Sequence, residues 1–365
     1  MDNHAKYMQL ALELAATAED RTYPNPMVGA VIVAGGKIIG KGYHSKAGAD
    51  HAEVAAIKSV SGSLKGSEMF VTLEPCAHYG KTPPCTEIII KSGICKVNVA
   101  MFDPNPLVSG RGIKALRKAG ISVRTGLLKL QANQLNRKYI KYITTGFPYV
   151  TVKLAQSIDG KIAARDGSSK WITCERSRKY VKKLRSSFDA ICVGANTVKE
   201  DDPTLLAEGN KGREVSRIVV DSSLKMSVNS NLIKTAWRVP LIIGTTKLAS
   251  PRRVAKFSKI PGVEVIVTGP KAGKVSLRSF LKKLGQKGIV NILVEGGGEL
   301  AGSFVDEALA DEWIFFIAPK IIGGRHTSVK GKGVQNIADV VDLEDVRLEG
   351  SGDDLIIRGR SCSQG

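Results

Sequence analysis

One histidine and two cysteines, far apart in the sequence, place the strongest constraint on how this chain can fold. His51 begins the triplet His51-Ala52-Glu53, and Cys76 and Cys85 bound a loop of small, polar and proline residues. One imidazole and two thiolates form a three-ligand set for Zn²⁺, and catalytic zinc sites leave the fourth position to water. We therefore expect a fold that brings these three side chains to one point.

Glu53 adds a possible proton carrier to this set, because it is not needed as a ligand. His-x-Glu followed by Pro-Cys is the signature of zinc-dependent nucleobase deaminases. A His-Ala-Glu triplet alone is most often structural, but the combination with Pro75-Cys76 and a second cysteine favours a catalytic zinc site. A purely structural zinc would need a fourth protein ligand, for which His44 and His78 are the candidates.

The pattern of apolar residues predicts two α/β domains. A chain of 365 residues is long for one domain, and the segment Thr144 to Pro148 interrupts the helical pattern. We therefore expect domains at residues 1–146 and 147–365. The alternation of strands and helices in the first half predicts a three-layer α/β domain with a central sheet. Asp50 is the expected N-cap of a helix that begins at His51.

The expected elements follow from hydrophobic spacing. In the first half, helices are expected at 4–18, from 51, and at 86–91, 112–119 and 127–143. Strands are expected there at 28–33, through 38–39, and at 69–73, 96–101 and 121–124. In the second half, strands are expected near 149–154, 190–194, 216–221, 239–244, 263–267 and 290–295, with helices between them.

A glycine run, Gly296-Gly297-Gly298, follows the last of these strands. Glycines between a strand and a helix let backbone N–H groups approach a phosphate, although a plain loop is an equal alternative. No G-x-G-x-x-G motif opens a helix after the first strand of the second half, so a Rossmann dinucleotide site is not supported.

The formal charge of +20 leaves more than one class of partner open. Dispersed lysines and arginines are typical of a solvated surface, but they would also attract nucleic acid or anionic small molecules. Aromatic residues make up only 5% of the chain, which leaves few platforms on which bases could stack. A nucleic-acid deaminase is therefore the weaker alternative.

The sequence also predicts a cytoplasmic location. No apolar run approaches the roughly 20 residues of a membrane span, and no signal-peptide pattern opens the chain. The six cysteines are irregularly spaced, which is typical of a reducing compartment with a metal site.

Eight residues separate Cys76 from Cys85, in place of the usual Cys-x-x-Cys. This loop, together with Tyr23–Ala30, Asp103–Pro106 and Gly110-Arg111-Gly112, resembles the bifunctional deaminase/reductases of riboflavin biosynthesis. Their deaminase converts 2,5-diamino-6-(5-phosphoribosylamino)pyrimidin-4-one to 5-amino-6-(5-phosphoribosylamino)uracil. The resemblance implies a cytidine-deaminase-like first domain with zinc on His51, Cys76 and Cys85 and with Glu53 as proton donor. It implies substrate contacts from Asn25, His44, His78, Lys81, Asp103 and Asn105. Without the resemblance, Asn25 and Asn105 could equally be turn residues beside proline.

Residues 150–172 are similar to the reductase half of the same family, which has a dihydrofolate-reductase-like α/β fold and uses NADPH. The resemblance places NADPH against Ala155, Trp171, Thr173, Thr197, Asp201, Ser222, Gly297, Gly298, Glu299, Leu300, Ala301, Gly302 and Ser303. It places the phosphoribosyl substrate near Lys153, Ser169, Arg185, Leu205 and Glu295. It also implies a homo-oligomer that acts on small molecules, with no membrane and no nucleic acid.

One departure from the family pattern concerns the substrate phosphate. Many relatives carry an arginine shortly after the equivalent of Leu205, where this chain has Leu206-Ala207-Glu208. Arg213 could substitute for it, or Lys153 and Arg185 could suffice. A deaminase with a degenerate reductase half is the remaining alternative.

Overall fold

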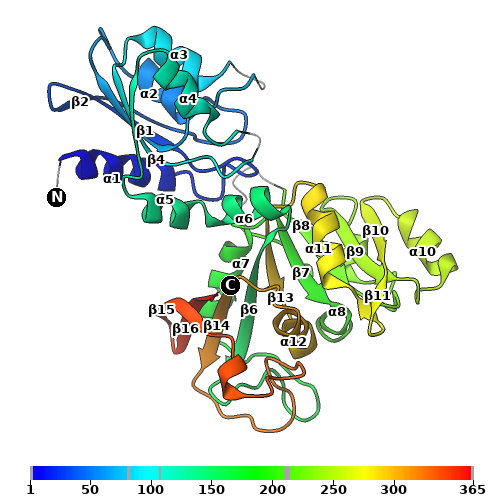
Figure 1. The fold of residues 1–365 in the computed structure, drawn as a ribbon. Coiled ribbons are helices and arrows are strands. Elements are labelled where there is room, and N and C mark those ends of the chain that lie inside the picture. The colour runs from blue at the N-terminus through cyan, green and yellow to red at the C-terminus, as the bar shows by residue number, and fades with distance from the viewer. Residues whose placement is uncertain (1–2, 80–82, 107, 209–213, 363–365) are drawn as a thin grey trace. The chain divides into compact units, whose positions relative to one another are not determined.

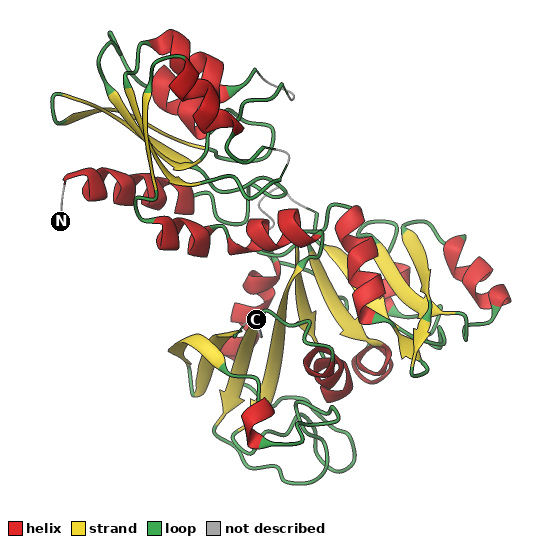
Figure 2. Ribbon diagram, in the orientation of Figure 1, coloured by secondary structure: helices red, strands yellow, loops and turns green. Residues whose placement is uncertain are grey.

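A computed structural model describes residues 3–79, 83–106, 108–208 and 214–362 (Figure 1). The chain folds into two compact units, Met1–Gly146 and Phe147–Gly365, called here the first and the second unit. In each unit helices cover a central sheet (Figure 2).

The first unit is built on a five-stranded sheet with the order β2-β1-β3-β4-β5. Its strands are β1 (Gly29–Ala34), β2 (Lys37–Tyr43), β3 (Glu68–Leu73), β4 (Lys96–Met101) and β5 (Ser122–Thr125). β1 runs antiparallel to both of its neighbours, whereas β3, β4 and β5 run parallel. Because parallel strands require crossover connections, a helix stands between each pair of them.

Helices cover both faces of this sheet. They are α1 (Asn3–Ala16), α2 (Ala52–Lys58), α3 (Cys85–Ser92), α4 (Arg111–Lys118), α5 (Lys129–Leu135) and α6 (Arg137–Thr145). α2, α3 and α4 lie on one face, and α1 and α5 lie on the other (Figure 1). The three-layer architecture predicted from the sequence is confirmed.

Two glycines allow these helices to touch the sheet backbone. A Cβ atom on Gly29 of β1 would lie 2.0 Å from the carbonyl oxygen of Ala11 in α1. A Cβ atom on Gly42 of β2 would lie 2.2 Å from the backbone nitrogen of Ala56 in α2. A larger residue at either position would push a helix away from the sheet. The position of α2, which follows His51, is therefore fixed closely.

The sequence pattern over residues 127–143 predicts one helix, and the structure corrects this to two. Asn136, which is buried, separates α5 from α6. Its side chain pairs with both backbone groups of Met27: the Met27 N–H donates to Oδ1 (2.8 Å), and Nδ2 donates to the Met27 carbonyl (2.9 Å). The helix is interrupted at Asn136, whose side chain is hydrogen-bonded to a residue 109 positions earlier in the chain.

Two further expectations about helix ends need correction. Asp50 is not the N-cap of α2, because His51 takes the extended N-cap conformation, with φ −68° and ψ 159°. Asp50 then lies outside the helix, and its carboxylate pairs with Lys58 at 2.7 Å. Cys85 does not precede its helix but is the first residue of α3.

The second unit contains a nine-stranded sheet with the order β10-β9-β8-β7-β13-β6-β14-β16-β15. The strands from β10 to β14 in this order are parallel, and β16 and β15 add an antiparallel hairpin at one edge. They are β6 (Tyr149–Ser157), β7 (Ala190–Gly194), β8 (Ser216–Val220), β9 (Leu241–Thr246), β10 (Val263–Thr268), β13 (Asn291–Glu295), β14 (Glu312–Ala318), β15 (Leu343–Ser351) and β16 (Asp354–Ser361). β11 (Pro270–Lys271) and β12 (Lys274–Val275) pair separately.

Both faces of this sheet are buried. In β7, Ala190 and Cys192 join one hydrophobic core, and Ile191 and Val193 join another on the opposite face. Burial on both faces explains why these strands read as continuous apolar runs. The helices are α7 (Glu175–Arg185), α8 (Ala195–Asp201), α9 (Asn231–Lys234), α10 (Pro251–Ser258), α11 (Leu277–Gln286) and α12 (Gly298–Asp306), with a 3₁₀ turn at Ile337–Asp339. Within the described residues, none of the helices has the length and apolar character to span a membrane.

The expected strands of the second half omit β14, β15 and β16. β14 is an apolar run, Trp313 to Ala318, and such a run does not by itself distinguish a strand from a buried helix segment. β15 is exposed along most of its length and pairs with β16 alone. These strands are therefore defined by their pairing partners more than by a local pattern.

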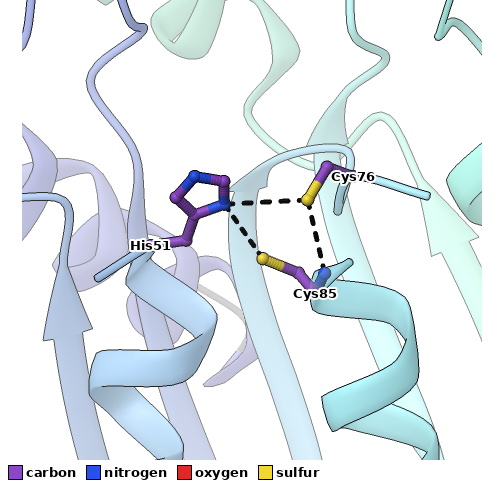
Figure 3. A group of neighbouring side chains, drawn as sticks. All are labelled: His51, Cys76 and Cys85. Atoms are coloured by element: carbon purple, nitrogen blue, oxygen red, sulfur yellow. Dashed lines mark hydrogen bonds between the residues drawn. The ribbon is translucent and has the colours of Figure 1, made fainter. Parts of the chain in front are cut away.

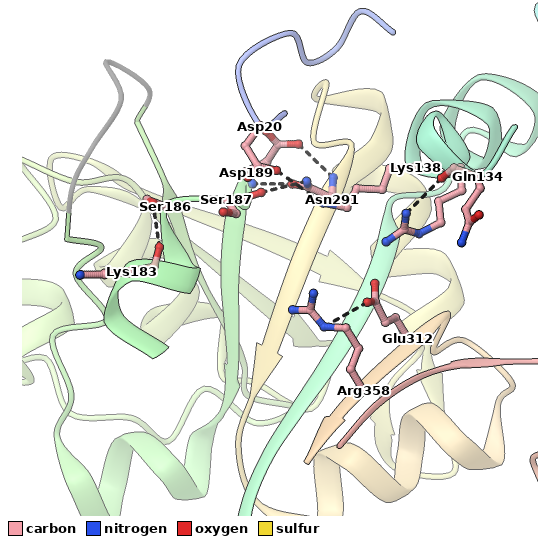
Figure 4. A network of polar contacts seen from close by, with 11 residues as sticks. Asp20, Gln134, Lys138, Lys183, Ser186, Ser187, Asp189, Asn291, Glu312 and Arg358 are labelled. Carbon is pink, nitrogen blue, oxygen red and sulfur yellow. Dashed lines mark hydrogen bonds and ion pairs between the residues drawn. The ribbon is translucent and has the colours of Figure 1, made fainter. Parts of the chain in front are cut away.

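A partly buried polar pair fixes the start of two central strands of the second unit (Figure 4). The Asp189 carboxylate accepts hydrogen bonds from the backbone N–H groups of Val290 (2.7 Å) and Asn291 (2.9 Å). In return, Asn291 Oδ1 accepts from the Asp189 N–H (2.6 Å), and Nδ2 donates to the carbonyl of Ser187 (3.2 Å). The register of β13 against β7 is thereby set at its first residues.

We predict that Asn136→Ala lowers the free energy of unfolding of the first unit by about 2–4 kcal/mol, because two hydrogen bonds are lost and the Met27 backbone groups stay unsatisfied. Urea unfolding followed by circular dichroism measures the change. The three tryptophans all lie in the second unit, so the fluorescence transition should not move. Gln131→Ala, an exposed change on α5, is the control. An unchanged midpoint for Asn136→Ala would contradict the prediction.

Candidate active sites

Three elements of the first unit bring His51, Cys76 and Cys85 together (Figure 3). His51 is the N-cap of α2, Cys76 lies beyond the carboxyl end of β3, and Cys85 begins α3. Nδ1 of His51 lies 3.1 Å from Sγ of Cys85 and 3.7 Å from Sγ of Cys76. The three potential ligand atoms all lie within 4.8 Å of one another, so the fold does bring these side chains to one point.

The donor set fits Zn²⁺ in both geometry and charge. Tetrahedral zinc with bonds of about 2.3 Å to sulfur and about 2.0 Å to nitrogen holds these ligand atoms about 3.5 Å apart, close to the observed separations. The pKa of Cys76 is lowered to about 4 by the hydrogen bond from the Cys85 thiol and by His51. The pKa of Cys85 is raised by its bond to Cys76 and by burial. A second thiolate therefore needs a nearby cation.

Neither histidine that could complete a structural zinc site joins this group. Nδ1 of the buried His44 lies 3.0 Å from the Asp50 carbonyl, and Nε2 lies 3.1 Å from Nδ2 of Asn25. His78 is exposed. Among the described residues, the ligand group consists of one histidine and two cysteines, which is the number of protein ligands typical of catalytic zinc.

Glu53 lies in the first turn of α2, beside the ligand group, with 4% of its surface exposed. Burial, and after it the negative charge on Cys76, raises its pKa to about 7. A carboxyl group with such a pKa can bind and release a proton at neutral pH. A cation on the three ligands would lower this pKa by attracting the carboxylate.

The residues that the family resemblance assigns to the deaminase substrate fall into two groups. Asn25 and His44 pair with each other, and the ring of His44 lies 5.6 Å from that of His51. Asp103 accepts a hydrogen bond from the Asn105 N–H (2.9 Å). Burial raises the pKa of Asp103, and the nearby His78 is among the groups that oppose this effect. Lys81 lies outside the described residues.

Two residues that hold these groups were missed by sequence reasoning. Tyr139 donates a hydrogen bond to Oδ1 of Asp103 (3.2 Å). It lies three positions after Asn136, which anchors Met27, so one helical face holds both segments. Glu74, the residue before Pro75-Cys76, is buried and accepts hydrogen bonds from the segment that begins at Asp103. The Glu-Pro-Cys order was the available signal for Glu74; Tyr139 offered none.

In the second unit, three of the residues assigned to the reductase substrate form a buried ionic cluster. Lys153 on β6 and Glu295 on β13 are register partners on neighbouring strands. Arg185 on α7 donates to both carboxylate oxygens of Glu295, at 2.6 and 3.1 Å, and Lys153 Nζ lies 4.0 Å away. Burial opposes the charge on Glu295, but Arg185 and Lys153 lower its pKa overall. Burial lowers the pKa of Lys153.

The loop after α8 is hydrogen-bonded to this cluster through Arg185. Leu205 is buried in the core, and Arg185 Nη1 donates to the carbonyl of Leu206 (3.1 Å). Glu208, which stands where the resemblance expects a phosphate-binding arginine, pairs with Lys182 at 3.1 Å. Arg213, the suggested substitute, lies outside the described residues. Ser169 lies in the loop between β6 and α7.

The residues assigned to NADPH follow the carboxyl ends of parallel strands, which is where open α/β sheets bind ligands. Ala155 lies on β6, and Trp171 and Thr173 lie in the loop after it. Thr197 and Asp201 lie on α8 after β7, Ser222 follows β8, and the segment Gly297 to Ser303 opens α12 after β13. The exposed Trp171 ring is stacked under Arg178, whose Cζ lies 4.4 Å from the ring centre.

Two glycines of this segment also have a packing role that the sequence pattern does not predict. A Cβ on Gly298 would lie 2.2 Å from the carbonyl oxygen of Thr327, and a Cβ on Gly302 would lie 2.2 Å from that of Lys330. These two glycines let the segment 327–331 pack against α12. At Gly297 the nearest described atom to the Cβ position, apart from its chain neighbours, is Thr197 Oγ1 at 3.9 Å, which leaves room for a ligand beside the helix N-terminus.

Asp159 is a further support that sequence reasoning missed. Its carboxylate accepts hydrogen bonds from Ser157 and from the N–H groups of Ile322 (3.1 Å) and Gly323 (2.7 Å). The Ser157 hydroxyl, followed by these N–H groups, lowers the pKa of Asp159 to about 2. Asp159 thus joins the end of β6 to the segment that follows β14.

Comparisons with known proteins match both halves of the chain. Residues 1–101 match the family described as cytidine and deoxycytidylate deaminase zinc-binding region, and residues 148–357 match the RibD C-terminal domain. The chain is 43% identical over 352 residues to the riboflavin biosynthesis protein RibD of Aquifex aeolicus, with 96% of both chains covered. It is 37% identical to the Escherichia coli protein of that name, with 96% of this chain and 97% of the relative covered.

Solved structures give the same result over 99% of both chains. A RibD structure from Acinetobacter baumannii has a TM-score of 0.85 at 32% identity. The diaminohydroxyphosphoribosylaminopyrimidine deaminase/5-amino-6-(5-phosphoribosylamino)uracil reductase of Thermotoga maritima has a TM-score of 0.83 at 34% identity. The predicted fold class, a cytidine-deaminase-like unit followed by a dihydrofolate-reductase-like unit, is confirmed.

We predict that the purified protein holds one Zn²⁺ per chain. Loss of a residue that hydrogen-bonds to a metal ligand typically weakens metal binding by about 10–100-fold. Because Cys85 is expected to be a ligand itself, Cys85→Ala should weaken zinc binding by more than that. Elemental analysis after gel filtration, with competition by a chromogenic chelator, measures this. Cys95→Ala, an exposed cysteine in the same unit, should keep its zinc. Equal zinc affinity in both variants would exclude Cys85 as a ligand.

Proposed function

The chain belongs to the RibD family of bifunctional riboflavin-biosynthesis enzymes, and we propose that each of the two sites carries out one of its two reactions. The chain is a deaminase and a reductase. In this proposal the first unit deaminates a phosphoribosylaminopyrimidine of the kind named for the Thermotoga maritima relative. The second unit reduces the ribosyl group of the product. A nucleic-acid substrate is less well supported, because the relatives match both units in full.

The observation that carries the deaminase proposal is a buried carboxyl group beside a three-ligand zinc set. His51, Cys76 and Cys85 would hold the zinc, which supplies Lewis-acid activation of water at neutral pH. Deamination adds the oxygen of water to the ring carbon and releases the amino nitrogen as ammonia. A proton must therefore travel from the water to that nitrogen. Glu53, close to the ligands and excluded from solvent, is the group that carries it.

His44 and Asn25 have a defined hydrogen-bond direction that suits substrate binding. The Asp50 carbonyl can only accept, so Nδ1 of His44 must donate to it. Burial lowers the pKa of His44, and in the neutral ring Nε2 accepts from Nδ2 of Asn25. The side-chain oxygen of Asn25 is thereby turned to accept an N–H group of a pyrimidine. Asp103, Asn105 and His78 would contact the opposite side of the substrate, and Lys81 its phosphate.

For the reductase, we infer that NADPH binds along the carboxyl ends of β6, β7, β8 and β13, where the residues assigned to it lie. It would supply the hydride. In the substrate, the bond between the ribosyl carbon and the ring oxygen breaks, the carbon gains the hydride, and the oxygen gains a proton. Lys153, whose pKa is lowered by burial, is placed to give that proton.

The ionic cluster also explains how the substrate phosphate could be bound without the arginine of many relatives. Arg185 has three of its five N–H donors committed, two to Glu295 and one to the carbonyl of Leu206. As far as the described residues show, two donors remain for an anion, together with the ammonium group of Lys153. Glu295 holds both cations in place.

A homo-oligomeric assembly and a cytoplasmic location belong to the same proposal. The family resemblance supports both, and the six free cysteines support the location alone. Light scattering coupled to gel filtration gives the mass of the assembly in solution.

We predict that Glu53→Gln lowers the rate of ammonia release by about 10²–10⁴-fold, the usual contribution of a positioned acid–base group. The amide cannot carry the proton, but it preserves the shape of the side chain. NADPH oxidation on substrate that has already been deaminated should be unchanged in the same variant, which serves as the control. Ammonia release at the wild-type rate would remove Glu53 from the mechanism.

We predict that Glu295→Gln lowers kcat/KM for NADPH oxidation by about 100-fold, because Arg185 and Lys153 lose the charge that positions them and a small displacement in an active site has this effect. Glu208→Gln, which removes an exposed ion pair, should stay within about fivefold. Steady-state kinetics on pre-deaminated substrate distinguishes the two. Similar losses in both variants would mean that the cluster is not part of the site.

A further inference from the structure

The carboxylate of Glu74 meets four backbone N–H groups. Oε2 accepts from Asp103 (3.2 Å) and Gly110 (2.9 Å), and Oε1 accepts from Gly112 (2.9 Å) and Ile113 (3.2 Å). Glu74 is 3% exposed. An ionised carboxylate has about four acceptor positions, and here each is matched by a donor. Glu74 therefore has no acceptor position left for substrate.

The donors come from one segment, which begins after β4 and enters α4. Gly112 and Ile113 lie in the first turn of α4, whose free N–H groups and dipole favour a negative charge. Asp103, at the other end of the segment, accepts the Asn105 N–H and the Tyr139 hydroxyl. One side chain thus closes the loop that carries Asp103 and Asn105.

Glu74 also stands two residues before the zinc ligand Cys76. Its own N–H donates to the carbonyl of Met101 (3.0 Å), which fixes the end of β3 against β4. A Cβ on Gly112 would lie 2.0 Å from the carbonyl oxygen of Pro75, so the two segments are in backbone contact. The carboxylate therefore ties the turn that presents Cys76 to the loop that presents Asp103 and Asn105.

We propose that Glu74 is a positioning residue of the deaminase, which holds the Asp103–Asn105 loop at a fixed place relative to Cys76. Without it, the zinc ligands and Glu53 remain, but the loop is free to move away from the substrate. The inference rests on the substrate-binding roles proposed above for Asp103 and Asn105. It assigns to Glu74 an effect on substrate affinity and orientation, and none on zinc binding.

The test is Glu74→Gln in the zinc-loaded, full-length protein. The amide offers one oxygen and turns an NH₂ group toward two backbone donors, so we expect KM for the diaminopyrimidinone phosphate to rise by about 10–100-fold. Zinc content and NADPH oxidation on pre-deaminated substrate should stay at wild-type values. The matched control is Glu68→Gln at the first residue of β3, the strand that Glu74 follows, where the carboxylate binds Lys96 and Asn98. It should leave KM unchanged.

Glu74→Asp separates position from charge. The charge is kept but the side chain is one methylene shorter, so aspartate cannot reach all four donors, and we expect KM to remain raised. Hydrogen exchange gives a readout independent of activity: in both variants the amides of Asp103, Gly110, Gly112 and Ile113 should exchange faster, while those of β3 and β4 stay protected. Wild-type KM in Glu74→Gln, full rescue by aspartate, or loss of zinc would each overturn the proposal.

Asn105→Ala shows whether the roles assigned to the loop are themselves wrong. If this variant keeps a wild-type KM, the substrate-binding proposal fails for Asn105, and the exchange rates alone then decide whether Glu74 fixes the loop. If it raises KM, the double variant with Glu74→Gln should raise KM by less than the product of the two single effects, because both act through one loop. A full product would contradict positioning through Asn105.

Discussion

Parallel strands end at a common edge, and both sites of this enzyme depend on that constraint. In the first unit, β3 and β4 are adjacent parallel strands that end side by side, which places Cys76 close to the segment that begins at Asp103. In the second unit, Lys153 and Glu295 are paired residues on the adjacent strands β6 and β13, so the sheet itself places them side by side. Helix N-termini lie at the same edges and supply free N–H groups. The chemistry is therefore carried by residues whose positions the sheet already determines.

The two sites differ in how they support charge away from water. The pKa of Cys76 is lowered and that of Cys85 is raised, as expected of two neighbouring thiols that share one proton in the absence of a cation. The cluster that we assign to the reductase substrate is balanced internally, because Glu295 lies between Arg185 and Lys153. Burial of charge is costly unless a partner is present. In the proposed sites, one unit would obtain that partner from a metal, and the other obtains it from its own side chains.

Sequence reasoning succeeded where a residue type and its spacing carry the chemistry. The group that the fold brings together, His51, Cys76 and Cys85, could be named because zinc ligation restricts the choice of residues, and most strands could be found because they are continuous apolar runs; the role of Glu53 stays a prediction. It failed where a role depends on distant backbone. Glu74 and Asn136 bind N–H and carbonyl groups, which every residue possesses, so nothing in the sequence marks their partners. Gly298 and Gly302 have a packing role that the sequence does not mark, because they make room for the segment 327–331.

Asn136 and Tyr139, at the start of α6, limit how far the first unit can be shortened from its C-terminal end. The matched zinc-binding region ends at residue 101, and a fragment with that boundary would keep the zinc ligands and Glu53. It would lack Asn136, which holds Met27, and it would lack both Asp103 and Tyr139, which holds Asp103. Such a fragment would be a metal-binding module without a shaped pocket. In gene fission or the design of chimaeras, the smallest transferable deaminase therefore extends through α6, some forty residues beyond the motif by which it is recognised.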